Sequence, residues 1–111
     1  TQVGSSAASD VYKRQRKITV EEIQRKVSEH YNIRLSDIIG PKRVRTYARP
    51  RQVAMYLAKQ MTSRSLPEIG RRFGGRDHTT VMHGVKRIEE LKIQDGQVAE
   101  DLEMLRRTLE A

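Results

Sequence analysis

Apolar residues recur along most of the chain at intervals of three and four, the spacing of one face of an α-helix. The clearest stripe has apolar residues separated by four, three and three positions: Val81, Val85, Ile88 and Leu91. Similar stripes predict helices over about 20–30, 50–62, 66–73, 78–93 and 98–109, with a short helical turn at 36–39. No segment alternates apolar and polar residues as a half-buried strand would. We therefore predict an all-α fold of five or six helices.

Short polar motifs mark where the predicted helices begin. Thr19 with Glu22, and Ser65 with Glu68, have the spacing of a capping box, in which two side chains satisfy backbone N–H groups of the first turn. Asp77 is placed to be the N-cap of the helix over 78–93. The Gly-Gly pair at 74–75 supplies the positive φ angles of a tight turn. The helices on either side of this turn therefore have the organisation of a helix-turn-helix.

Two segments lack an apolar stripe. Residues 1–17 are mostly small and polar, and we expect a linker, a tag or an artefact ahead of a single domain over 18–111. Residues 42–49 are rich in Lys and Arg, and we predict a basic loop there. Pro50 would then lie in the first turn of the next helix, where its missing N–H is tolerated.

The positive charge is concentrated in the middle of the chain. The 111 residues include 22 Lys and Arg against 14 Asp and Glu, a net charge of +8. Residues 40–87 hold 12 basic and 2 acidic residues, whereas residues 88–111 hold 3 basic and 7 acidic ones. The alternative is that these residues form a solvated basic face that binds no partner. However, a block this one-sided repels itself without a counter-anion, so we expect an anionic partner, with nucleic acid the first candidate.

The composition excludes several other classes. There is no Cys, which excludes a disulfide framework, a thiolate zinc site and a Cys nucleophile. Aromatic residues make up 5% of the chain, too few for a platform that stacks single-stranded bases. His78 and His83 lie about 140° apart around a helix, which does not suit a shared metal ion. We therefore expect no metal, no cofactor and no catalytic site.

The first turn of the helix over 78–93 carries the candidate base-reading residues, because these positions face base edges in a helix-turn-helix. Asp77 can accept from a cytosine amino group, and His78 can donate to purine acceptors. Thr79 and Thr80 offer hydroxyls and also methyl groups that suit thymine. The alternative is that Asp77 only caps the helix and that the threonines are ordinary first-turn residues.

The predicted basic loop is a second candidate surface. Lys42, Arg43, Arg45 and Arg49 have no acidic neighbour there, and such a loop can follow phosphates or enter a narrow minor groove. On the helix that follows, Gln52 and Lys59 are candidates for phosphate contact. Arg51 could contact a phosphate or read guanine through a bidentate contact.

The run from Leu66 to Ile88, which contains Gly-Gly-Arg-Asp-His-Thr-Thr, resembles the signature of the C-terminal DNA-binding domain (domain IV) of the DnaA family of bacterial chromosomal replication initiators. Residues 48–59 are similar to the same family, and the resemblance covers about 18–111. It implies a Trp-repressor-like helical domain that binds DnaA boxes at a replication origin. The family's full-length protein carries an ATP-binding AAA+ module, and we find no counterpart of it here. We therefore expect no enzyme activity, neither ATP hydrolysis nor origin melting.

The resemblance also implies site residues and partners. The base-contacting set would be Arg43 in the minor groove, Arg51, and the major-groove readers Asp77, His78, Thr79 and Thr80. The set that contacts the DNA backbone would be Lys42, Arg45, Gln52, Lys59, Leu66, Pro67, Arg76 and Lys86. The expected partner is double-stranded DNA with origin repeats; acidic phospholipid and, through regions absent here, other initiator subunits are further candidates. We expect a monomeric isolated domain in the cytoplasm, associated with the nucleoid.

Two alternative functions stay open at this point. A helix-turn-helix transcriptional regulator shares the fold but would be a dimer, with half-sites one helical turn apart. A non-specific binder of anionic lipid or RNA would show little preference between a matched and a scrambled duplex.

Overall fold

The computed structural model describes residues 18–40 and 45–110, and it is entirely helical over those ranges. The helices are α2 (Val20–Tyr31), α3 (Leu35–Ile39), α4 (Arg45–Met61), α5 (Leu66–Arg72), α6 (His78–Gln94) and α7 (Gly96–Glu110). The prediction of an all-α fold with five or six helices is confirmed. The predicted linker over 1–17 lies outside the described residues.

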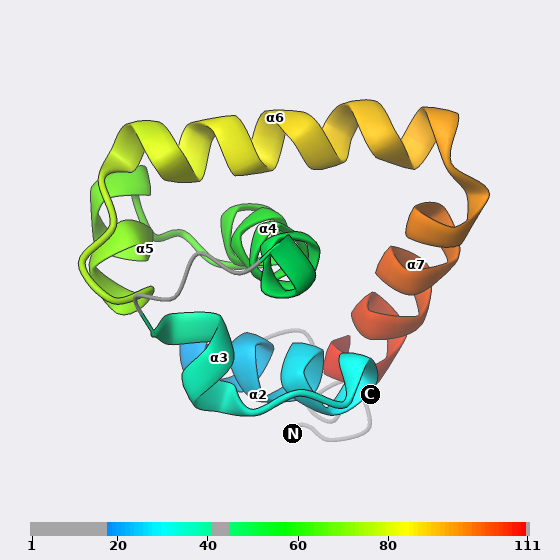
Figure 1. The fold of residues 1–111 in the computed structure, drawn as a ribbon, viewed down its shortest axis with the longest axis horizontal. Helices are drawn as coiled ribbons and strands as arrows, with labels where there is room; N and C mark the ends of the chain where they lie inside the picture. Colours follow the sequence, from blue (N-terminus) through cyan, green and yellow to red (C-terminus); the bar gives the residue numbers. More distant parts are fainter. Residues whose placement is uncertain (1–17, 41–44, 111) are drawn as a thin grey trace, which may run out of the picture.

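Helix α4 forms the centre of the fold, and the other helices surround it. Figure 1 shows α4 nearly end-on, with α6 along one side, α2 and α3 along the opposite side, and α5 and α7 closing the two ends. Helix α4 packs against α6, α2, α3 and α5. A helix in this position needs apolar side chains on more than one face. That requirement is met by an unbroken buried run, from Val53 to Ala58.

The apolar stripes seen in the sequence form the core. Val81, Ile88 and Leu91 of α6 are buried, and Val85 packs against the same cluster half-buried. The stripe of α7 is buried as well, and α7 turns back from the end of α6 to reach α2. Burying one apolar face of each outer helix is the main source of stability in such a fold.

The hydroxyl bond of each predicted capping box is present at the start of α2 and of α5. The Thr19 hydroxyl accepts from the N–H of Glu22 at 3.1 Å, ahead of α2. The Ser65 hydroxyl accepts from the N–H of Glu68 at 3.3 Å, ahead of α5. Each bond satisfies one of the N–H groups that a helix start leaves without an intrahelical partner.

The start of α4 differs from the prediction. Residues 45–49 were expected in a loop, but they are helical, and Pro50 lies inside the helix rather than in its first turn. A proline at this position removes a single backbone bond, to the carbonyl of Thr46, close to the helix start. Tyr47, Ala48 and Arg49 are half-buried, and their packing supports the additional turn. Of the predicted loop, residues 42–44 lie outside the described residues.

Candidate nucleic-acid interface

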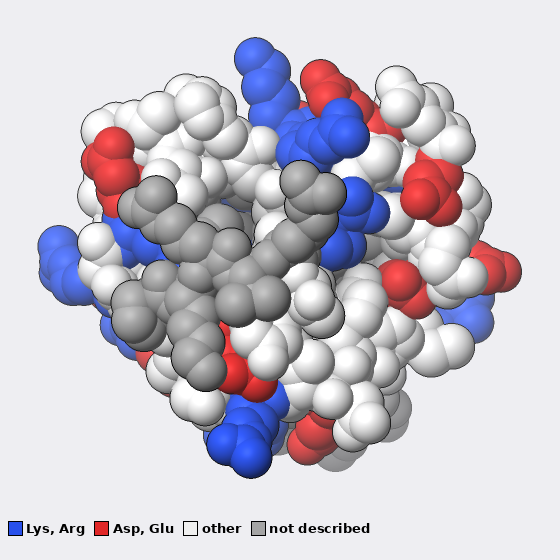
Figure 2. All heavy atoms as spheres, in the orientation of Figure 1, with Lys and Arg blue, Asp and Glu red and all other residues white. Residues whose placement is uncertain are grey.

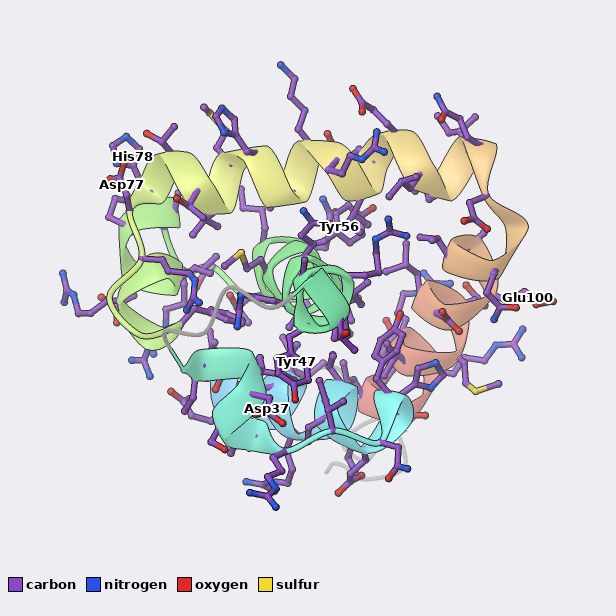
Figure 3. All side chains as sticks on the ribbon, viewed as in Figure 1. Asp37, Tyr47, Tyr56, Asp77, His78 and Glu100 are labelled. Carbon is purple, nitrogen blue, oxygen red and sulfur yellow. The ribbon has the colours of Figure 1, made fainter. Side chains whose placement is uncertain are left out.

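The four candidate reading residues lie together at the exposed N-terminal end of α6. Asp77 is the N-cap residue, and its carbonyl accepts from the N–H of Thr80 at 3.0 Å. Its carboxylate makes no capping hydrogen bond; instead Oδ1 lies 3.1 Å from Nδ1 of His78. The side chains of Asp77 and His78 are 67% and 57% exposed, and Figure 3 shows them side by side at the outer corner of the fold. The Asp77 carboxylate is therefore available to an external hydrogen-bond donor.

A tight turn between α5 and α6 sets the position of the N-terminal end of α6. Gly74 and Gly75 have φ angles of +79° and +75°, which L side chains rarely adopt. The N–H of Arg76 then donates to the carbonyl of Gly70 at 2.8 Å, which brings the start of α6 onto α5. A Cβ at position 70 would lie 2.1 Å from the Arg76 carbonyl oxygen, so this approach requires a glycine. The predicted helix-turn-helix is thus present, with its second helix projecting the candidate readers.

A groove of about 670 Å³ runs between α4 and the first half of α6. Thr80 lines it from the first turn of α6, and Gln52 lines it from α4. His83 also lines this groove and is exposed, although it is not among the residues predicted to contact DNA. The signal was available, because a residue three positions after Thr80 lies on the same face of a helix.

Arg51, a predicted contact for a base or a phosphate, makes hydrogen bonds inside the protein. The residue is 7% exposed and is one of those that line the groove between α4 and α6. Its Nε donates to the carbonyl of Ile38 and its Nη2 to the carbonyl of Asp37, both at 2.8 Å. Burial, and next the neighbouring charge of Arg76, lower the pKa of Arg51 from its ordinary value. Arg51 therefore joins α4 to the end of α3 and also lines the groove, and its contact with a base stays a prediction.

Arg76, a predicted contact for the DNA backbone, also makes hydrogen bonds inside the protein. It is half-buried, its Nη2 donates to the carbonyl of Gly40 at 2.7 Å, and its Nη1 donates to the carbonyl of Phe73. The guanidinium therefore bridges the turn before α6 and the residue that follows α3.

The other predicted backbone contacts lie on three helices. Lys59 near the end of α4 and Lys86 on α6 are exposed, as is Pro67 at the start of α5, whereas Leu66 and Gln52 are half-buried. Lys42 and Arg43 lie outside the described residues; Arg45 opens α4, and its side chain is not among those described.

Some of the basic side chains form ion pairs with acidic residues of the protein. Arg72 pairs with Glu21 and, at 2.9 Å, with Glu68; Arg87 lies 3.5 Å from Glu90. Among the described residues visible in Figure 2, Lys and Arg side chains are interspersed with Asp and Glu.

The described ranges hold neither a metal-binding cluster nor a membrane-spanning helix. No group of three or more His, Asp or Glu side chains there is arranged to hold a metal ion. None of the helices described has the length and apolar character needed to cross a membrane.

Comparison with known proteins gives one consistent result. Residues 20–88 match the family model described as the bacterial dnaA protein helix-turn-helix. The chain is similar to the chromosomal replication initiator protein DnaA of Roseobacter denitrificans, with 90% identity over 96 residues, which are 86% of this chain and 21% of that protein. The protein of the same name from Ruegeria pomeroyi is 88% identical over 97 residues, which are 87% of this chain and 21% of the relative.

A more distant relative extends the comparison. The chromosomal replication initiator protein DnaA of Zymomonas mobilis is 57% identical over 96 residues, which are 86% of this chain and 20% of that protein. The chain thus spans about a fifth of the length of the curated relatives it matches. The matched segment contains α5, the Gly-Gly turn and the candidate reading residues of α6.

Proposed function

The chain belongs to the bacterial DnaA family through the C-terminal helix-turn-helix domain of that family, and on this premise we propose that it binds double-stranded DNA sequence-specifically at origin repeats during initiation of chromosome replication. The observation that carries the proposal is the exposed first turn of α6. There the Asp77 side chain makes no capping bond, and the side chains of Asp77 and His78 are 67% and 57% exposed.

In the proposed complex the start of α6 enters the major groove, which admits an α-helix and offers a distinct donor and acceptor pattern for each base pair. The Asp77 carboxylate accepts from a cytosine amino group, and His78 donates to a purine acceptor. The methyl groups of Thr79 and Thr80 contact thymine. Each good contact of this kind contributes about 1–3 kcal/mol of discrimination against a wrong base.

Phosphate contacts supply the remaining affinity. Lys59 and Lys86 are exposed cations that can approach the duplex backbone, and Pro67 is exposed at the start of α5. Arg43 is proposed as a minor-groove contact because the family resemblance assigns it that role. Because each neutralised phosphate releases counterions, binding weakens as salt is raised.

The proposed function also implies where the protein acts and what else it binds. We propose that the chain acts in the cytoplasm at the nucleoid, with acidic phospholipid as a second partner. Contacts with other initiator subunits are assigned to parts of the relatives outside the matched segment.

The test compares two threonine variants on a duplex with a DnaA box and on a scrambled duplex. Thr80→Ala removes a proposed base contact, whereas Thr108→Ala removes an exposed threonine on α7 whose hydroxyl donates to the Met104 carbonyl. We expect Thr80→Ala to weaken binding to the box duplex about 5- to 150-fold, from the 1–3 kcal/mol above, with little change on the scrambled duplex. Equal weakening on both duplexes would show that Thr80 does not read bases.

A further inference from the structure

Arg76 occupies a connecting position in this fold. It immediately precedes Asp77, the first candidate reader, yet its own side chain is turned inward and half-buried. Its Nη2 donates at 2.7 Å to the carbonyl of Gly40, which is 36 residues away in the sequence. Its Nη1 donates to the carbonyl of Phe73 in the turn before α6. One guanidinium thus joins the end of α3 to the start of α6.

Other contacts bring the same two segments together. A Cβ at Gly74 would lie 2.2 Å from the carbonyl oxygen of Ile39, so the turn and the end of α3 approach at backbone distance. Arg51 donates to the carbonyls of Asp37 and Ile38 at this end of α3. The last carbonyls of a helix lack intrahelical partners, and charged donors bind them more strongly than neutral ones.

We propose that Arg76 is a positioning residue, which orients the first turn of α6 for sequence readout by fixing the turn against α3 and does not itself contact DNA phosphate. The inference rests on the proposed function, since it concerns how the same surface reads a duplex. It replaces the expectation that Arg76 contacts the DNA backbone. The planar guanidinium suits this role because it presents several N–H donors in a rigid fork, whereas a lysine ammonium cannot hold two carbonyls in that geometry.

Two variants separate positioning from phosphate contact. Arg76→Lys keeps the charge and loses the fork, so a phosphate contact would survive and the positioning contact would not. Arg76→Gln removes the charge, so a lost phosphate contact would make the slope of log K against log salt shallower by about 0.9. Arg71 provides the matched control, since it is an arginine on α5 with a side chain 74% exposed; Arg71→Lys and Arg71→Gln undergo the same measurements.

The experiment titrates the full chain and each variant against box and scrambled duplexes at several salt concentrations. Circular dichroism first establishes that each variant is folded under the titration conditions. We expect both Arg76 variants to lose at least tenfold of the preference for the box duplex, with the salt slope on the scrambled duplex unchanged. The Arg71 variants are expected to keep the wild-type preference.

Three results would overturn the inference. The first is an Arg76→Lys variant that matches the wild type on both duplexes, and the second is a shallower salt slope for Arg76→Gln with the preference intact. The third is lowered stability with unchanged preference, which would make Arg76 a structural residue only. If the wild-type chain itself shows no preference for the box duplex over the scrambled duplex, the proposed function is wrong. The wild-type titration alone shows this, independently of the Arg76 variants. If Arg76→Lys does not fold, Arg76→Gln carries the test through the preference and the slope.

Discussion

Replacing Gly70 with alanine tests whether the α5–α6 turn requires a glycine for close approach. Gly70 lies inside α5, where helix propensity alone predicts a gain of about 0.5–1 kcal/mol for Gly→Ala. The structure predicts the opposite sign. The new Cβ would lie 2.1 Å from the Arg76 carbonyl oxygen and 3.3 Å from Cγ2 of Val81, and backbone cannot move aside as a flexible side chain can.

Overpacking costs about 1–3 kcal/mol, and a clash with backbone falls in the upper half of that range, about 2–3 kcal/mol, which exceeds the propensity gain. We therefore expect Gly70→Ala to lower the free energy of unfolding by about 1–2 kcal/mol. In a domain of this size, that corresponds to a fall in Tm of about 4–16 °C. Urea unfolding followed by circular dichroism measures the first quantity, and a thermal scan measures the second.

Gly96→Ala is the matched control for this measurement. Gly96 is the first residue of α7, and a Cβ there would meet no atom within 4 Å. The same substitution should therefore be neutral or stabilising by up to about 1 kcal/mol. A Gly70→Ala variant as stable as the wild type, or more so, would refute the close approach between the turn and α5.

Two further variants test contacts elsewhere in the fold. Oδ1 of Asp101 lies 2.9 Å from Nε2 of His30, and this contact joins α7 to α2. Asp101→Asn should lower the free energy of unfolding, measured in urea, by about 1–3 kcal/mol. Glu100→Gln on the exposed face should leave it unchanged, and equal losses in the two variants would contradict this contact. Burial raises the pKa of Glu21, but its backbone hydrogen bond and Arg72 outweigh that effect and hold it below the ordinary value of 4.5. Glu21 therefore stabilises the fold above that pH and loses its contribution as pH falls through the folded pKa. Glu21→Gln should therefore lose less stability than the wild type as the pH falls below 4.5, and an identical loss in both proteins would contradict this assignment.

The helices were predictable because their signals are local. The spacing of Val81, Ile88 and Leu91 predicted a buried face, and all three are buried. The caps at Thr19 and Ser65 also formed as their spacing indicated. Periodicity and capping depend on residues within a turn or two of one another, so a sequence displays them directly.

The start of α4 was not predictable in the same way. Pro50 is a local signal for a helix start, yet the helix begins at Arg45 because packing of residues 47–49 supports an earlier turn. Tertiary contacts of this kind override local preference.

The roles of the arginines were the least predictable part of the site. Nothing near Arg51 or Arg76 in the sequence indicates that their partners are the carbonyls of residues 37, 38 and 40. A basic residue beside a recognition helix is by itself equally consistent with phosphate contact. Their hydrogen bonds to the end of α3 become visible only in the three-dimensional structure.

A binding selection from a library of random duplexes tests most directly whether the first turn of α6 selects a DNA sequence. The wild-type chain and an Asp77→Asn variant would be selected in parallel at the same salt concentration. The wild type should enrich one motif, and Asp77→Asn should relax the base preference at a single position within it. Enrichment of no motif by the wild type, or of an identical motif with identical preferences by Asp77→Asn, would contradict sequence readout by this turn.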